Sequence, residues 1–154
     1  MTIYVDSSAL VALYVPERFS NAARKAVRAT PQVPFTRLHE LEVANAFALL
    51  AGRGAITSTE HDAIRGQLRE DVEGQRLLPT QVEWDDVFTK AEEFSATYTA
   101  RLFTRSLDLL HVAAAHLLGT RSFVSADDRQ LAVAKATRLR TIDIKVEPHR
   151  RSKR

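Results

Sequence analysis

Residues 2–13 read TIYVDSSALVAL, and this stretch indicates how the fold begins. The first four residues are apolar or β-branched, which is typical of a short buried strand. Asp6, Ser7 and Ser8 follow at once, and these residue types cap helix N-termini. The stretch therefore predicts a strand that ends where a helix starts, with an acidic side chain at the junction.

The same alternation of strand and helix continues along the chain. Strong stop signals separate the segments, among them Pro16, Pro31 and the Gly52-Arg53-Gly54 run. Strands separated by helices predict an α/β fold with a parallel sheet. The further strands are expected at 33–36, 77–82, 122–125 and about 140–144, and the helices at 8–14, 18–29, 38–51, 57–75, 84–97, 106–118 and 128–137.

Length and composition exclude several classes of protein. At 154 residues we expect one domain, over residues 1–147, followed by a basic, flexible tail at 148–154. The chain has no cysteine, which excludes disulfides, thiolate metal sites and a cysteine nucleophile. The N-terminus lacks the basic region of a secretory signal, and the apolar stretch 107–118 is too short to span a bilayer. We therefore expect a soluble, cytoplasmic protein.

The net charge of +3 arises at the end of the chain. Residues 149–154 (HRRSKR) contain four basic residues and no acid; without those four, the 22 Lys and Arg fall to 18, against 19 Asp and Glu. A basic tail attracts polyanions without sequence preference, whereas the alternative is a solvated end with no specific role.

Two acidic residues stand where an acid is not expected. Asp6 follows a strand that is predicted to be buried, at the carboxyl end where α/β sheets place their ligands. Asp108 lies in the helix 106–118, which is apolar nearly all round, and burial of an unpaired carboxylate there is costly. The alternatives are local: Asp6 as a helix N-cap, and Asp108 as a first-turn acid favoured by the helix dipole.

Two further acids complete a candidate cluster. Asp127 follows the strand that ends at Ser125, as Asp6 follows its own strand, and Glu42 lies among apolar residues of the helix 38–51. Helix capping, with Ser125 and Asp128 as a capping-box-like pair, is the alternative for Asp127, and plain exposure is the alternative for Glu42.

Together the four acids predict a cation site. Carboxylates that converge on one cleft repel one another unless a divalent cation neutralises them, and oxygen ligands without cysteine favour Mg²⁺ or Mn²⁺. Such a site suits phosphodiester hydrolysis, because the metal activates a water and stabilises the charge that develops on phosphate.

At these residues the sequence resembles the PIN-domain family, and within it the VapC-type toxin endoribonucleases of type II toxin–antitoxin systems. The first and third matching segments are the more specific, and the second and fourth support them by their order along the chain. The four segments are YVDSSALVAL at 4–13, ELEVANA at 40–46, SLDLLHVAAA at 106–115 and FVSADDRQL at 123–131.

The resemblance implies a fold and a set of site residues. The fold is a five-stranded parallel sheet of order 3-2-1-4-5 flanked by helices, and the activity is a Mg²⁺- or Mn²⁺-dependent endoribonuclease. Asp6 and Asp108 match the principal metal ligands and Glu42 and Asp127 the remaining acids, with Ser8 and Ser125 as supporting hydroxyls. Glu40 is the alternative to Glu42, since the two lie nearly opposite on a helix, and Asp128 is the alternative to Asp127.

The resemblance also implies partners. The substrate is a structured RNA such as tRNA or rRNA, a VapB-like antitoxin neutralises the toxin by lying along the active-site groove, and the toxin is a homodimer or part of a larger toxin–antitoxin assembly. A non-catalytic PIN-like interaction module is the alternative function. A phosphoacceptor receiver domain is disfavoured, because Asp6 is followed by two serines rather than by a second acid.

The five histidines do not suggest a metal site. His111 and His116 are five residues apart and do not share a helix face, and the other three are scattered. We expect His111 to pack beside Asp108 or to form a hydrogen bond near it.

Overall fold

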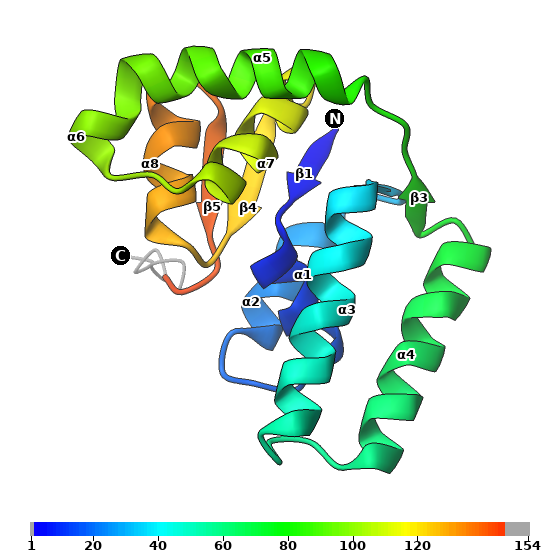
Figure 1. Cartoon of the computed structure of the whole chain (residues 1–154). Helices are drawn as coiled ribbons and strands as arrows, with labels where there is room; N and C mark the ends of the chain where they lie inside the picture. Colours follow the sequence, from blue (N-terminus) through cyan, green and yellow to red (C-terminus); the bar gives the residue numbers. More distant parts are fainter. Residues whose placement is uncertain (1, 147–154) are drawn as a thin grey trace, which may run out of the picture.

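A computed structural model describes residues 2–146, and Figure 1 shows the arrangement of its elements. The predicted tail at 148–154 lies outside these residues. The elements alternate as the sequence predicts: β1 (Ile3–Val5), α1 (Ser7–Tyr14), α2 (Ser20–Val27), β2 (Val33–Phe35), α3 (Arg37–Gly52), α4 (Ser58–Glu73), β3 (Leu77–Pro79), α5 (Trp84–Phe94), the π-helical turn η1 (Ser95–Thr99), α6 (Ala100–Leu102), α7 (Ser106–Leu117), β4 (Ser122–Ser125), α8 (Asp128–Ala136) and β5 (Arg140–Asp143).

The strands pair in parallel, but in two sheets rather than one. One sheet has the order β1-β4-β5 and the other pairs β2 with β3. Tyr4 lies opposite Phe123 in the first sheet, and Pro34 lies opposite Leu78 in the second. The α/β prediction is confirmed, whereas the expectation of one continuous five-stranded sheet is wrong between β2 and β1.

The sequence of β2 explains the break. The Val33 N–H donates to Arg76, and the Phe35 carbonyl accepts from Thr80, so these two residues pair toward β3. Successive residues of a strand alternate, which turns Pro34 toward β1, and proline has no N–H to donate.

The next donor on that side, the Thr36 N–H, bonds to the ring of His39 at 3.0 Å instead of to β1. Because a backbone N–H can only donate, Nδ1 of His39 is the acceptor, and its Nε2–H donates to the Val5 carbonyl at 2.9 Å. One imidazole therefore stands between Thr36 and Val5. Burial, followed by the neighbouring His111, lowers the pKa of His39 to about 3, which keeps the ring neutral.

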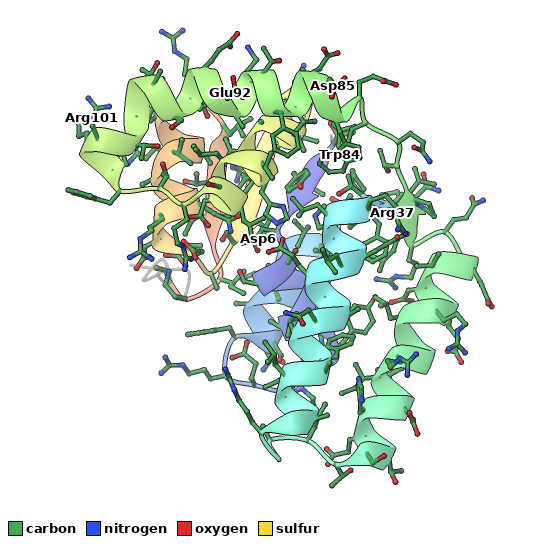
Figure 2. All side chains as sticks on the ribbon, in the orientation of Figure 1. Asp6, Arg37, Trp84, Asp85, Glu92 and Arg101 are labelled. Carbon is green, nitrogen blue, oxygen red and sulfur yellow. The ribbon has the colours of Figure 1, made fainter. Side chains whose placement is uncertain are left out.

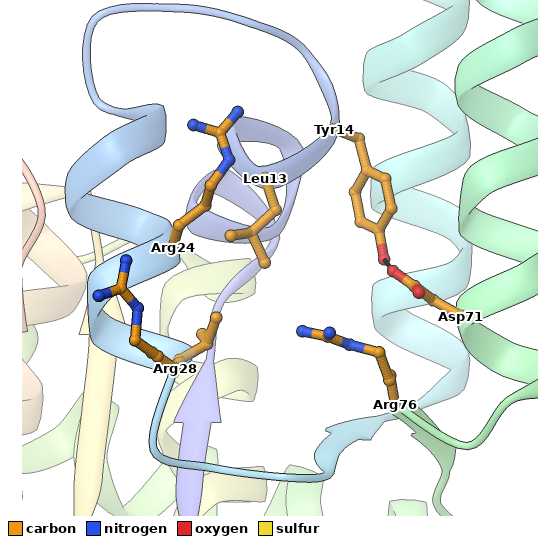
Figure 3. Close-up of a pocket in the computed structure, with 7 residues that line it drawn as sticks. Leu13, Tyr14, Arg24, Arg28, Asp71 and Arg76 are labelled. Atoms are coloured by element: carbon orange, nitrogen blue, oxygen red, sulfur yellow. Dashed lines mark hydrogen bonds between the residues drawn. The ribbon is translucent and has the colours of Figure 1, made fainter.

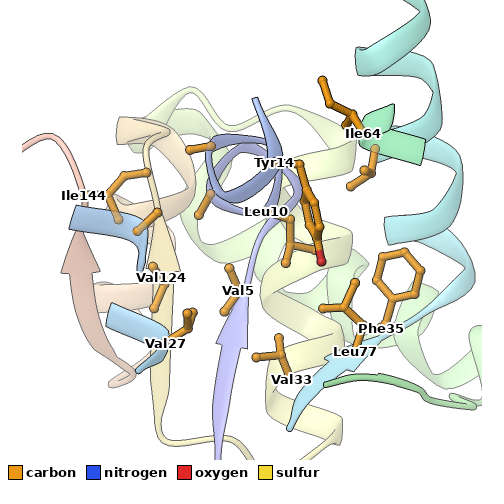
Figure 4. Close-up of a cluster of buried hydrophobic side chains, with 14 of the residues drawn as sticks. Val5, Leu10, Tyr14, Val27, Val33, Phe35, Ile64, Leu77, Val124 and Ile144 are labelled. Carbon is orange, nitrogen blue, oxygen red and sulfur yellow. The ribbon is translucent and has the colours of Figure 1, made fainter. Parts of the chain in front are cut away.

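The sheet β1-β4-β5 lies between two layers of apolar packing. Ile3 and Val5 point into one cluster with residues of α1, α2, α3 and α4, part of which Figure 4 shows. Tyr4, between them, points to the opposite side and packs with α5, α7 and α8. Its ring stacks on that of Phe123 at 5.4 Å between centroids. This alternation is the period of two that a strand buried on both faces requires.

Helix α7 is buried, as its apolar composition predicts. Residues 108–115 are all buried, Asp108 and His111 included. Within residues 2–146, no helix combines the length and the apolar character needed to cross a membrane.

Candidate active site

A pocket of about 400 Å³ lies where the first turns of α1 and α7 meet the connection from β4 to α8. These are carboxyl-end positions of parallel strands, where α/β sheets bind their ligands. Figure 2 places Asp6 in the interior of the molecule, whereas Asp85, Glu92 and Arg101 project from its outer helices. The pocket lining consists of three carboxylates and their polar neighbours: Glu42, Asp108, Asp127, Ser7, Ser8, Arg105, Ser106, Leu107 and Gln130.

Asp6 lies beneath this lining and is completely buried. It caps α1 by accepting the Ala9 N–H at 2.9 Å, so the N-cap interpretation holds as well. Ser8 and Ser125 donate to its carboxylate at 2.8 and 2.6 Å. Burial raises the pKa of Asp6, and the charge of His111 together with these hydrogen bonds opposes that rise. The two serines predicted as supporting hydroxyls thus hold the Asp6 carboxylate in place.

Asp108 and Asp127 occupy two other helix starts. One oxygen of Asp108 accepts the Arg105 N–H at 2.9 Å in the first turn of α7. One oxygen of Asp127 accepts the N–H groups of Arg129 and Gln130 at the start of α8. Capping and pocket lining are therefore compatible: Oδ1 of Asp108 has no hydrogen bond from residues 2–146, and Oδ2 of Asp127 pairs with Arg105 in the pocket lining.

Glu42 reaches the pocket from the other sheet's side, on α3. Its carboxylate accepts hydrogen bonds from Ser7, at 3.0 Å, and from His111. Burial alone would raise the pKa of Glu42, but these two hydrogen bonds and the charge of His111 outweigh it and lower the pKa. Glu42 is therefore an ionised acid at the pocket, with Oε2 free of hydrogen bonds from residues 2–146.

His111 is positioned in turn by Tyr4, whose hydroxyl lies 2.8 Å from Nδ1. Burial, followed by the charges of Asp6 and Glu42, raises the pKa of Tyr4 well above its usual value, so the phenol stays protonated. Nε2–H of His111 then donates to Glu42. We expected His111 to pack beside Asp108 or to form a hydrogen bond near it; in the structure its hydrogen-bond partner is Glu42.

The two alternative acids point elsewhere. Glu40 pairs with Arg37 on the outer face of α3. Asp128 is 84% exposed and pairs with Lys145 at 2.6 Å. The pocket therefore contains Glu42 and Asp127.

Arg105 is the one lysine or arginine that forms an ion pair with a pocket acid in residues 2–146. Its Nη2 lies 3.1 Å from Asp127 Oδ2, and its Nε lies 3.4 Å from Asp108 Oδ2. The guanidinium thus connects two carboxylates that come from different helix starts.

The donor set suits a hard divalent cation, since every charged ligand candidate at the pocket is a carboxylate. The present spacing is wider than one ion requires: within residues 2–146, no three carboxylate or imidazole groups are placed to hold a metal together. The contacts explain this spacing, because serines and Ala9 occupy Asp6 while Arg105 occupies Asp108 and Asp127.

Sequence reasoning missed four residues of the site: Tyr4, Ser7, His39 and Arg105. Arg105 had a local signal, because it stands three residues before the buried Asp108, the spacing of a helix N-cap and its N3 residue. Tyr4 and Ser7 had none, since their partners are 107 and 35 residues away.

A second pocket, of about 420 Å³, has the opposite charge. Arg24, Arg28 and Arg76 line it with Tyr14 and Asp71, which are joined by a hydrogen bond of 2.6 Å (Figure 3). One carboxylate among three guanidinium groups does not suit a cation. Of these two pockets, only the one at Asp108 and Asp127 has the charge of a metal site.

Comparisons with known proteins agree with this geometry. A profile of the PIN domain family matches residues 3–136. The chain is 30% identical to Ribonuclease VapC3 of Pyrobaculum aerophilum over 132 aligned residues. The alignment covers 86% of this chain and 93% of that protein.

Solved structures share the fold. The crystal structure of FitAcB from Neisseria gonorrhoeae superposes with a TM-score of 0.66 at 12% identity, over 94% of this chain and 99% of that one. Mycobacterium tuberculosis VapC20, described as a toxin that cleaves the sarcin-ricin loop, superposes with a TM-score of 0.61 at 20% identity, over 85% and 94% of the two chains. The chain therefore belongs to the PIN domain family, in which it is related to the VapC ribonucleases.

Proposed function

We propose that this protein is a VapC-like endoribonuclease toxin that hydrolyses RNA phosphodiester bonds with Mg²⁺ or Mn²⁺. The observation that carries the proposal is that Glu42, Asp108 and Asp127 line one pocket, whose Ser8 donates a hydrogen bond to the buried Asp6. The relationship to VapC3, a ribonuclease, supports it.

Asp6, Glu42, Asp108 and Asp127 would hold the cation, which supplies a water of lowered pKa and neutralises charge on the phosphate. Ser8 and Ser125 fix the Asp6 carboxylate. Glu42, ionised and oriented by Ser7 and His111, would use Oε2 to hold the cation. Water would attack the phosphorus as the P–O bond to the leaving oxygen breaks, the water would lose a proton to solvent and the leaving oxygen would take one up, so no covalent enzyme intermediate forms.

The same relationship suggests the partners. A structured RNA is the proposed substrate, as in the sarcin-ricin loop cleaving toxin VapC20. A VapB-like antitoxin is the proposed inhibitor, since one structural neighbour is FitAB bound to a DNA fragment. A homodimer, alone or within a toxin–antitoxin assembly, is the proposed form of the toxin.

Cleavage of RNA by the purified full-length chain tests the proposal. Incubation with total RNA and ~5 mM Mg²⁺ or Mn²⁺, a saturating level for a weak carboxylate site, is expected to produce discrete new 5′ ends. EDTA should abolish these ends, and excess Mn²⁺ should restore them. Absence of any metal-dependent cleavage, in a preparation shown to be folded by circular dichroism, would contradict the proposal.

The pairing of Arg105 with Asp108 and Asp127 favours one alternative, a non-catalytic PIN-like interaction module, because a guanidinium already offsets part of the charge of these acids. Such a module would not bind a divalent cation. A calorimetric titration that detects no Mg²⁺ or Mn²⁺ binding at millimolar concentration would support it over the enzyme.

Removal of Arg150–Arg154 from the basic tail, which lies outside the described residues, tests its contribution to RNA binding. Deletion is expected to weaken RNA affinity and to flatten the dependence of affinity on salt, while metal binding is unchanged. The measurement is the slope of log K against log salt concentration for bulk tRNA without metal. An unchanged slope would assign the tail no role in RNA binding.

A further inference from the structure

The contacts of Arg105 suggest a role beyond neutralising the pocket. Arg105 is the N-cap residue of α7, so its backbone is fixed beside the pocket by the bond from its N–H to Asp108. Its side chain is 63% exposed, whereas that of Asp108 is 3% exposed. The exposed guanidinium of Arg105, whose backbone is anchored at the pocket, therefore pairs with the buried carboxylate of Asp108.

The ion pairs of Arg105 are weak enough to exchange. Pairs that involve an exposed partner contribute little, because water and salt screen them. The Nε contact of 3.4 Å with Asp108 is long, and the Nη2 contact of 3.1 Å with Asp127 is to an acid that is itself 23% exposed. A divalent cation carries twice the charge of the guanidinium and competes for the same oxygens.

A guanidinium released from the two acids would stay near the pocket, because the backbone of Arg105 is anchored there by the hydrogen bond to Asp108. Its planar fork of N–H donors matches the oxygens of a phosphate group. Among residues 2–146 no other lysine or arginine lines this pocket, so Arg105 alone supplies a positive side chain there.

We propose that Arg105 exchanges partners when the pocket binds its divalent cation: it pairs with Asp108 and Asp127 without the cation, and with a phosphate group of the RNA substrate once the cation is bound. The inference rests on the proposed function. It makes Arg105 a residue that opposes metal binding and favours substrate binding, so that a phosphate is attracted only after the metal has entered.

Mn²⁺ titration by calorimetry tests the first half of the proposal, on the full chain and on the variants Arg105→Ala and Arg105→Lys. Arg65→Ala, an exposed arginine of α4, is the matched control. Arg105→Ala is expected to bind Mn²⁺ about 3- to 10-fold more tightly, the range that corresponds to two surface ion pairs. Arg105→Lys, which retains the charge, and Arg65→Ala should stay within about twofold of the parent.

The Nε–H resonance of Arg105 in a ¹⁵N–¹H spectrum tests the second half, with inorganic phosphate as the probe. Its assignment follows from its loss in Arg105→Lys. Addition of Mg²⁺ is expected to shift the resonance toward those of exposed arginines, and phosphate added afterwards should shift it again. Phosphate added without Mg²⁺ should leave it in place.

The outcomes separate this inference from the proposed function. Equal Mn²⁺ affinity in the parent and Arg105→Ala would overturn the exchange while leaving a metal-dependent enzyme intact. A resonance that ignores phosphate in the Mg²⁺-loaded protein would overturn the phosphate contact. If no variant binds Mn²⁺, the proposed function fails and the exchange fails with it.

Discussion

Asp108→Asn is expected to abolish metal-dependent RNA cleavage, with a loss of at least about 10³-fold in rate. The substitution keeps the shape of the side chain and the acceptor for the Arg105 N–H, so α7 keeps its first turn. It removes a charge that faces the pocket and that a divalent cation requires. Asp6→Asn should abolish cleavage in the same way, because it too removes a negative charge. Its fold should survive, because the amide can still form hydrogen bonds with Ser8 and Ser125, whose hydroxyls both donate and accept.

The measurement is single-turnover cleavage of a mapped RNA fragment in Mg²⁺ and in Mn²⁺. Asp86→Asn, an exposed acid in the first turn of α5, is the matched control and should cleave at the parent rate. Thermal unfolding of each variant shows whether the fold survives. Full activity in both Asp6→Asn and Asp108→Asn would exclude these acids as metal ligands.

Low pH is expected to destabilise the fold through protonation of His39. The folded protein keeps this imidazole neutral, with a pKa of about 3, whereas the ring in the unfolded chain takes up a proton near pH 6.5. Below pH 6.5 the unfolded state therefore binds more protons, and stability falls as the pH drops toward 3. At pH 5 this one group is expected to cost about 2 kcal/mol relative to pH 7 or above.

Urea unfolding at pH 7.5 and pH 5 measures the effect. His39→Gln keeps a donor and an acceptor but cannot titrate, so the variant should lose about 2 kcal/mol less than the parent over this range, whatever its stability at pH 7.5. The groups nearest to His39 include Tyr4 and His111, which remain in both proteins. A pH dependence in His39→Gln identical to that of the parent would refute the assignment.

Local signals predicted much of this molecule. The junction of β1 and α1 can be predicted because the strand, the capping residue and the helix follow one another within residues 2–13. The burial of helix α7 can be predicted because apolar residues occupy nearly all of its faces. Asp6 and Asp127 could be selected because each follows a predicted strand at the carboxyl end of the sheet, and Asp108 because it lies in an apolar helix.

The remaining features depend on contacts between distant residues. Glu42 meets His111 across 69 positions, and His39 meets Val5 across 34. No periodicity predicts such pairs. Pro34, in contrast, was a visible warning against a continuous sheet, because a proline in a central strand removes a ladder hydrogen bond.

The break between β1 and β2 passes directly beside the pocket. Asp6 and Asp127 follow strands of one sheet, and Glu42 lies on the helix that follows β2 of the other. Across this seam the ring of His39 bridges the two backbones, Ser7 and His111 form hydrogen bonds with Glu42, and side chains of both sheets pack in one apolar cluster. The position of Glu42 relative to Asp6 and Asp127 is therefore set by side-chain contacts and not by a ladder of peptide hydrogen bonds.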